Sequence, residues 1–158
     1  MLFILKQNKD KDIIHRLKKI NEEQQEDIVK KIATILDRYS LSEENKKNIL
    51  VLTEAVKLSS FFAGKETAFI EDFKIIGHDL KILEESIENY QRKSAETREY
   101  FLSIIKSVNM SEDDQKSVHS LLLALEINSF EEGCIQKVID INWPVHNDME
   151  FGPGRSFR

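Results

Sequence analysis

The chain has 158 residues, enough for one domain that buries its own apolar core. Hydrophobic residues make up 41% and charged residues 32%, which is typical of a soluble globular protein and too apolar for a disordered chain. A net charge of −5 argues against a dedicated nucleic-acid-binding domain, because such domains normally carry a basic surplus. Residues 1–20 nevertheless hold six basic and two acidic residues, whereas residues 101–158 hold five basic and nine acidic ones. Such polarity can guide head-to-tail or antiparallel association.

Cysteine content and hydropathy indicate the compartment. Cys134 is the only cysteine, so no disulfide can form within the chain, as is usual in a reducing compartment. The apolar start at residues 1–5 ends at Lys6 and is too short for the apolar region of a signal peptide. No apolar run approaches the ~20 residues that a transmembrane helix needs. We therefore expect a cytoplasmic protein with neither a membrane nor a nucleic acid as its partner.

Apolar residues at helical spacing predict a first helix at about residues 10–38. Its stripe comprises Ile13, Leu17, Ile20, Gln24, Ile28, Ile32, Ile35 and Tyr39. Ser40 with Glu43 forms a capping-box pattern and Ser42 is an equally good N-cap, so a second helix begins there. This second helix carries the apolar residues Ile49, Leu52, Val56 and Phe62. Gly64 is well placed to end it.

The longest pattern lies between Phe69 and Val108, at alternating steps of four and three residues. Its members are Phe69, Phe73, Ile76, Leu80, Leu83, Ile87, Tyr90, Ser94, Thr97, Phe101, Ile104 and Val108. This spacing is that of one helical stripe and predicts long helices packed side by side. Its polar middle leaves two alternatives for residues 66–108: one helix of roughly forty residues, or a hairpin that breaks near residues 93–95 with Ser94 as N-cap. We favour the continuous helix, because the spacing persists across the polar stretch.

The last third of the chain predicts two further helices and a tail. Ser111 caps the first of them, and residues 118–127 are apolar on nearly every side, which is typical of a helix at the centre of a core or an interface. Ser129 with Glu132 predicts a last short helix. We detect no internal repeat. The chain divides into a helical bundle at residues 1–142 and an extended tail rich in proline, glycine and aromatic residues at 143–158.

The string His78-Asp79-Leu80-Lys81 resembles the His-x-Leu-Lys core of histidine phosphotransfer domains and the dimerisation helices of histidine kinases. Both families are helical bundles in which an exposed imidazole accepts a phosphoryl group. The resemblance therefore implies His78 as a phospho-acceptor, with Lys81 balancing the incoming charge. It covers four residues. Ile82 stands where phosphotransfer domains usually have a small residue, and the proline usual in the kinase helices is missing.

Spacing disfavours metal, cofactor and nucleophile sites. His78-Asp79 matches the dipeptide of metal-dependent phosphohydrolases, but only distant residues could complete that ligand set. No histidine follows a glutamate by three residues, as a di-iron bundle requires. Cys134 with His119 or His146 would form a nucleophile pair, although a lone cysteine is more often a packed residue. We therefore expect no catalytic residue, no metal and no cofactor.

Six apolar residues are candidates for binding a partner. They are Phe101, Ile104, Val108, Trp143, Phe151 and Phe157. The first three would lie beyond the bundle on a continuous helix over residues 66–108, exposed unless a second chain covered them. The three aromatic residues of the tail are costly to leave in water, so they either pack on the bundle or anchor a partner.

These observations predict an all-α, up-and-down bundle of four to six helices, with one very long helix or a helical hairpin at about 66–108. The function that fits best is a non-enzymatic protein-interaction module, such as an adaptor, an inhibitor, an immunity protein or a chaperone. The first alternative is a histidine phosphotransfer protein that uses His78. The second is a coiled-coil scaffold that self-associates as a homodimer.

Overall fold

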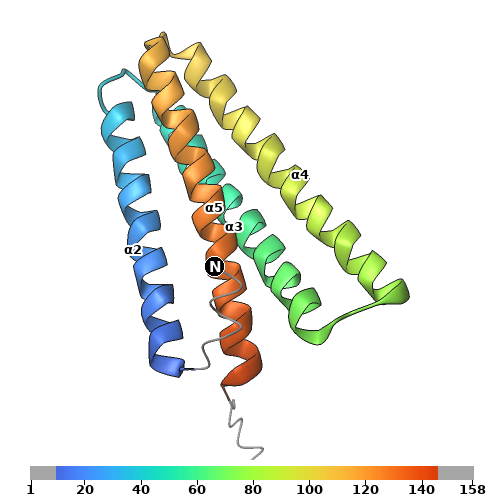
Figure 1. The fold of residues 1–158 in the computed structure, drawn as a ribbon. Coiled ribbons are helices and arrows are strands. Elements are labelled where there is room, and N and C mark those ends of the chain that lie inside the picture. Colours follow the sequence, from blue (N-terminus) through green and yellow to red (C-terminus); the bar gives the residue numbers. More distant parts are fainter. Residues whose placement is uncertain (1–9, 146–158) are drawn as a thin grey trace, which may run out of the picture.

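A computed structural model describes residues 10–145, which form four helices: α2 (Lys11–Leu36), α3 (Glu43–Phe73), α4 (Gly77–Ser107) and α5 (Glu112–Asn142). Each helix runs opposite to the one before it, and no strand occurs among these residues (Figure 1). The prediction of an all-α fold is therefore confirmed. Within this part of the chain, no helix is long and apolar enough to cross a membrane.

Serine side chains begin α3 and α5, as the sequence indicates. The hydroxyl of Ser42 accepts a hydrogen bond from the N–H of Asn45 at 3.1 Å, and that of Ser111 accepts one from the N–H of Asp114 at 3.2 Å. Each bond satisfies one of the N–H groups that the first turn of a helix leaves unpaired. Of the two predicted caps for α3, Ser42 is therefore the one used.

The turn between α3 and α4 lies at residues 74–76, and both predictions for residues 66–108 misplace it. α4 runs unbroken across residues 93–95, and no single helix covers the whole stripe. The turn requires left-handed backbone, with φ of 48° at Lys74 and 71° at Gly77. Glycine adopts this conformation without a Cβ clash, so Gly77 is the break that the regular spacing conceals.

Two other predicted boundaries are wrong because small residues lie inside helices. Gly64 does not end the second helix; α3 continues to Phe73. Ser129 does not cap a separate short helix; it is buried in the middle of α5. Both residues lie where helices approach each other closely. Packing between helices, not the end of a helix, therefore explains the small side chain at each position.

The main core lies at the end of the molecule where the α2–α3 and α4–α5 turns meet (Figure 1). Its buried side chains come from all four helices: Ile28, Ile32, Leu36, Ile49, Phe101, Leu102, Ile104, Ile105, Met110, Val118, Leu122 and Leu125. α5 packs against α2 and α3, whereas α4 packs mainly against α3 and diverges from α5 toward its own N-terminus. The prediction of a central helix at 118–127 is therefore confirmed.

The predicted face of α2 is wrong over its first turns. Ile13 and Ile20 are 39% and 44% exposed, whereas Ile14 is fully buried. Asn21 and Gln25 are buried beside it, at 3% exposure each, because both take part in a hydrogen-bond network with α5. Because these inward-facing residues are polar, the apolar periodicity of the sequence does not indicate the buried face of α2.

An internal repeat relates α3 to α5, so the prediction of no repeat is wrong. The bounds of α3, residues 43 and 73, become the bounds of α5, residues 112 and 142, when 69 is added to each. Nine of the 32 residues from 42 to 73 are identical to their counterparts at 111–142. These pairs are Ser42/Ser111, Glu43/Glu112, Lys47/Lys116, Leu52/Leu121, Ala55/Ala124, Ser60/Ser129, Phe61/Phe130, Gly64/Gly133 and Ile70/Ile139.

The repeat appears in space as a pseudo-two-fold arrangement of two hairpins, α2–α3 and α4–α5. A Cβ added to Gly64 would lie 2.0 Å from the carbonyl oxygen of Phe130, and one added to Gly133 would lie 2.0 Å from that of Phe61. Such reciprocal contacts are the mark of a two-fold interface. The same relation exchanges the α2–α5 contact with the α4–α3 contact. Only glycine at these two positions lets the backbones of α3 and α5 come so close.

Candidate functional site

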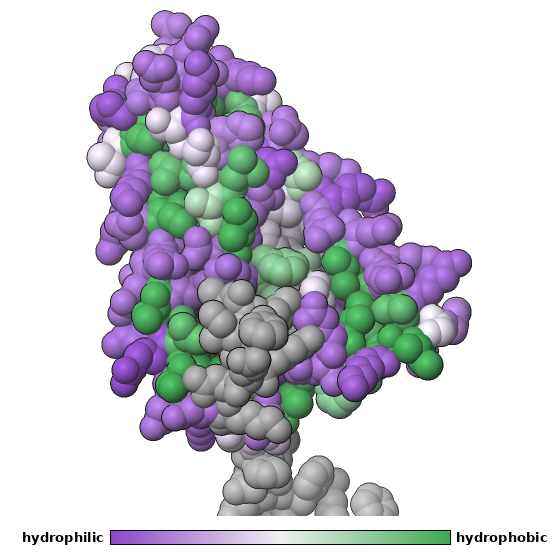
Figure 2. Space-filling model, viewed as in Figure 1, coloured by the Kyte–Doolittle hydropathy of each residue, from purple (hydrophilic) through white to green (hydrophobic). Residues whose placement is uncertain are grey.

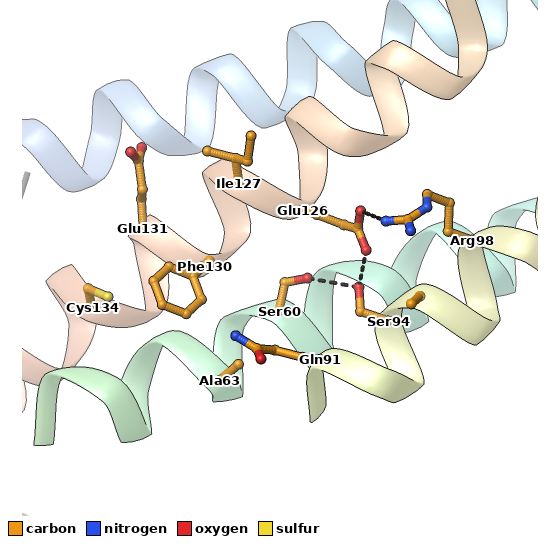
Figure 3. Close-up of a pocket in the computed structure, with 11 residues that line it drawn as sticks. Ser60, Ala63, Gln91, Ser94, Arg98, Glu126, Ile127, Phe130, Glu131 and Cys134 are labelled. Carbon is orange, nitrogen blue, oxygen red and sulfur yellow. Dashed lines mark hydrogen bonds and ion pairs between the residues drawn. The ribbon is translucent and has the colours of Figure 1, made fainter. Parts of the chain in front are cut away.

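A cavity of about 520 Å³ opens between α3, α4 and α5, midway along these helices (Figure 3). Its apolar wall is formed by Ala63 of α3, Ala95 of α4, and Ile127, Phe130 and Cys134 of α5. This volume lies within the range of pockets that bind small organic molecules.

Polar side chains form one side of the cavity (Figure 3). The hydroxyls of Ser60 and Ser94 are 3.0 Å apart, and Ser94 donates to a carboxylate oxygen of Glu126 at 2.5 Å. The other oxygen of Glu126 pairs with Arg98, and the two charged side chains are only 14% and 18% exposed. The Nε of Arg98 is buried without a hydrogen-bond partner. The charges of this side therefore compensate each other, with one N–H group of Arg98 left unpaired.

The corresponding place between α2 and α5 is filled instead of open. Gln25, the counterpart of Ser94, accepts a hydrogen bond from Ser129 at 3.1 Å and donates to Asn21 and Glu132 at 2.7 Å each. Glu132 is the counterpart of Ala63 under the same 69-residue shift. Two long polar side chains therefore occupy the space that Ser94 and Ala63 leave free between α4 and α3.

Cys134 lines the cavity but is unsuited to act as a nucleophile. Burial, together with the nearby Glu71 and Glu131, raises the pKa of its thiol to about 12. The thiol donates a hydrogen bond to the carbonyl oxygen of Gly64 at 3.3 Å. Because only the thiolate is reactive, the structure assigns Cys134 a packing role. His119, its proposed partner, is exposed on the surface of α5, and His146 lies outside the described residues.

A second feature is the end of the α3–α4 hairpin, residues 66–88, which we call the arm. Phe73, Ile76 and Ile82 are 52%, 81% and 50% exposed there. Figure 2 shows apolar side chains at the surface of this end, flanked by hydrophilic ones. The arm carries seven carboxylates and two lysines, a net charge of −5. Glu66 has one buried carboxylate oxygen without a hydrogen-bond partner.

The arm lacks the apolar cluster that closes the equivalent end of the α2–α5 pair. That cluster consists of Ile14, Ile135, Val138 and Ile139, with Leu17 and Trp143 packed against it. Under the 69-residue shift, Ile135 corresponds to Glu66, Leu17 to Ser86, and Trp143 to Lys74. Three counterparts are therefore polar, whereas Leu83, Phe69 and Ile70, the counterparts of Ile14, Val138 and Ile139, are apolar and half-buried. The rings of Phe62 of α3 and Tyr90 of α4 stack on each other, 5.6 Å apart.

His78 and Lys81, the residues of the phosphotransfer resemblance, are both exposed in the first turns of α4. The exposure of His78 agrees with its place opposite the predicted apolar stripe. In the described part of the chain, no group of three or more His, Cys, Asp or Glu side chains is arranged to hold a metal ion. Phospho-acceptance by His78 therefore stays a prediction.

Two of the six candidate partner-binding residues are internal. Phe101 is fully buried and Ile104 is 8% exposed, because the hairpin folds α4 back onto the core, so the prediction that both are exposed for a partner is wrong. Val108 is half-buried. Trp143 packs on the cluster at the end of α5, beside the ring of His15 at 6.4 Å. Two other candidates, Phe151 and Phe157, lie outside the described residues.

No family model, no curated protein and no solved structure matches this chain.

Proposed function

We propose that this protein is a non-enzymatic interaction module that binds a basic amphipathic helix of a partner protein through the arm. The observation that carries the proposal is the exposure of three large apolar side chains at one end of one hairpin, Phe73, Ile76 and Ile82. Grouped apolar residues rimmed by polar ones are typical of protein-binding surfaces.

The charge of the arm selects the class of partner. Its net charge of −5 equals that of the whole chain, so the attraction for a cation is concentrated there. Complementary charge accelerates association and excludes acidic partners. A helix fits best, because its apolar face can cover the exposed apolar side chains at the end of α3 and the start of α4.

The test uses two synthetic 18-residue helices with the same leucine stripe, one with lysine and one with glutamate at the polar positions. We expect the lysine peptide to bind in titration calorimetry and to weaken at least tenfold in the double variant I76S/I82S. Leu50 and Val51 are equally exposed on α3, at 65% and 61%, far from the arm. The double variant L50S/V51S is therefore the matched control and should bind as the wild type does.

Two results would overturn this proposal. One is equal binding of the two peptides, which would show that charge does not select the partner. The other is an equal loss of binding in L50S/V51S, which would show that the arm has no special role. Added salt should weaken the lysine complex, because the arm is exposed and its charges are screened.

The alternatives have their own readouts. If residues 1–20, with their basic surplus, supply the cationic segment, light scattering will show a homodimer that I76S/I82S dissociates. A homodimer that forms through one continuous helical stripe is no longer expected, because Phe101 and Ile104 pack in the core of their own chain. If the chain is a phosphotransfer protein, a cognate kinase or response regulator will produce an acid-labile phosphoryl label that H78A abolishes.

A further inference from the structure

From the cavity between α3, α4 and α5, we infer that this protein binds a small organic cation with an apolar body, held against Phe130, Ile127 and Glu131. This cavity is separate from the arm, and it has no open counterpart between α2 and α5.

The cavity exists because two small residues replace two large polar ones. Between α2 and α5, the carboxamide of Gln25 fills the space and its hydrogen bonds are satisfied by Asn21, Ser129 and Glu132. Between α4 and α3, Ser94 is too short to fill the same space, and its hydroxyl bonds only to Ser60 and Glu126. The cavity is open and wide enough to admit water, so its apolar lining is hydrated in the free protein. A ligand that fills the cavity would remove this apolar surface from water.

The walls determine the body of the ligand. Ala63, Ala95, Ile127, Phe130 and Cys134 present carbon and a protonated thiol to the cavity. Ile127 is 61% exposed at the rim, which is costly for a side chain of its size. A hydrocarbon or aromatic body of about ten carbon atoms would cover it.

The charges determine the head of the ligand. One arginine and two glutamates line the cavity, for a net charge of −1. Arg98 and Glu126 neutralise each other. Glu131, half-buried beside Phe130, has no hydrogen-bond or ion-pair partner among the described residues. Glu131 extends from α5 on the same side as Ile127 (Figure 3). An ammonium group at this rim would pair with the Glu131 carboxylate, while the apolar body of the ligand covers Ile127 and reaches Phe130. A carboxylate head would meet two like charges.

The experiment compares three probes with one body: 4-phenylbutylammonium, 4-phenylbutanol and 4-phenylbutanoate. Binding is measured from amide chemical shifts of residues around the cavity in the full-length protein. We expect the ammonium compound to bind at least tenfold more tightly than the carboxylate, with the alcohol between them. In E131Q the ammonium compound should bind no better than the alcohol. E112Q, at the far end of α5, is the matched control and should leave the order unchanged.

Two further variants test the location. S94Q places in the cavity the residue that already fills the equivalent site, so it should abolish binding. I127S removes an exposed part of the wall, cannot disturb the core, and should weaken all three probes. The inference is overturned if no probe shifts the cavity residues, if the carboxylate binds as tightly as the ammonium compound, or if S94Q and I127S both bind as the wild type does.

Discussion

The α2–α5 pair and the α4–α3 pair share one geometric frame, yet only the first ends in a buried apolar cluster. At the core end, equivalent positions hold equivalent residues, such as Ile35 and Ile104 or Val56 and Leu125. At the other end, Glu66 of the α4–α3 pair stands where the cluster of the α2–α5 pair has Ile135.

This difference suggests how a duplicated hairpin acquires a function. Each copy carries one of the replacements: Ser94 lies in the α4–α5 hairpin and Glu66 in the α2–α3 hairpin. Ser94 in place of glutamine opens a cavity, and Glu66 in place of isoleucine puts a carboxylate where the other pair has an apolar cluster. Both replacements meet between α3 and α4, while the close contact at Gly64 and Gly133 holds the two hairpins together.

The largest expected effect is on the free energy of unfolding, and it compares a substitution in the core with one in the arm. Leu122 is fully buried, so L122D should lower the free energy of unfolding by about 3–5 kcal/mol, the cost of an uncompensated buried charge. Leu80 is half-buried in the arm, so L80D should lower it by only about 1 kcal/mol. Urea titration followed by circular dichroism measures both. Equal losses would mean that the arm is packed as tightly as the core.

The second prediction concerns the glycine contact on which the pseudo-symmetry depends. G64A and G133A should each destabilise the protein by about 1–3 kcal/mol, because the added Cβ meets a backbone carbonyl that cannot move aside. In an open helix the same change would stabilise by up to about 1 kcal/mol. Similar losses for the two variants in thermal unfolding would support the two-fold relation. A gain in either would contradict the close approach of α3 and α5.

Much of the fold follows from the sequence, and the errors have common causes. The period of the apolar residues predicts helices, and Ser42 and Ser111 are visible as caps because capping depends on a local hydrogen bond. The turn before Gly77 is hidden because the apolar spacing continues across it by coincidence. Gly64 suggests a helix end, but close packing, which no local pattern reports, explains its presence.

The candidate site was harder to predict than the fold. Ser94 stands out as a polar residue at a core position, and that signal is real. Its meaning depends on Gln25, which is 69 positions earlier and becomes comparable only when the repeat is recognised. The Ser-Phe-x-x-Gly string at residues 60 and 129 is the sequence signal that would have revealed the repeat. The pairing of Arg98 with Glu126 depends on two helices meeting and cannot be read from local spacing.

The third prediction concerns Glu66 of the arm, replaced by the residue at the equivalent position of α5. E66I introduces the isoleucine found at the equivalent position, removes a buried carboxylate without a partner, and should raise the free energy of unfolding by about 1 kcal/mol. Glu84 is exposed on α4, so E84I should leave stability nearly unchanged and serves as the control. If the arm binds a basic helix, E66I should also weaken binding of the lysine peptide. A loss of stability in E66I would show that Glu66 already has a favourable role in the free protein.

The smallest expected effect is on the melting temperature, and it tests how Asp114 differs from its counterpart at the core end. Asp114 corresponds to Asn45 in the other hairpin, and only Asp114 has charge-assisted partners: the hydroxyl of Tyr39 donates to it, and Arg38 lies 2.9 Å away. The Tyr39 hydrogen bond, reinforced by Arg38 and opposed in part by burial, lowers the pKa of Asp114 below its usual value. A lowered pKa means that the carboxylate form stabilises the fold above pH ~4, and that this contribution is lost as pH falls through the folded-state pKa.

D114N should therefore lower the melting temperature slightly at pH 7 and leave it unchanged near pH 2. N45D, without such partners, should not raise it at pH 7. Equal effects of D114N at both pH values would show that the carboxylate charge has no part in the contact.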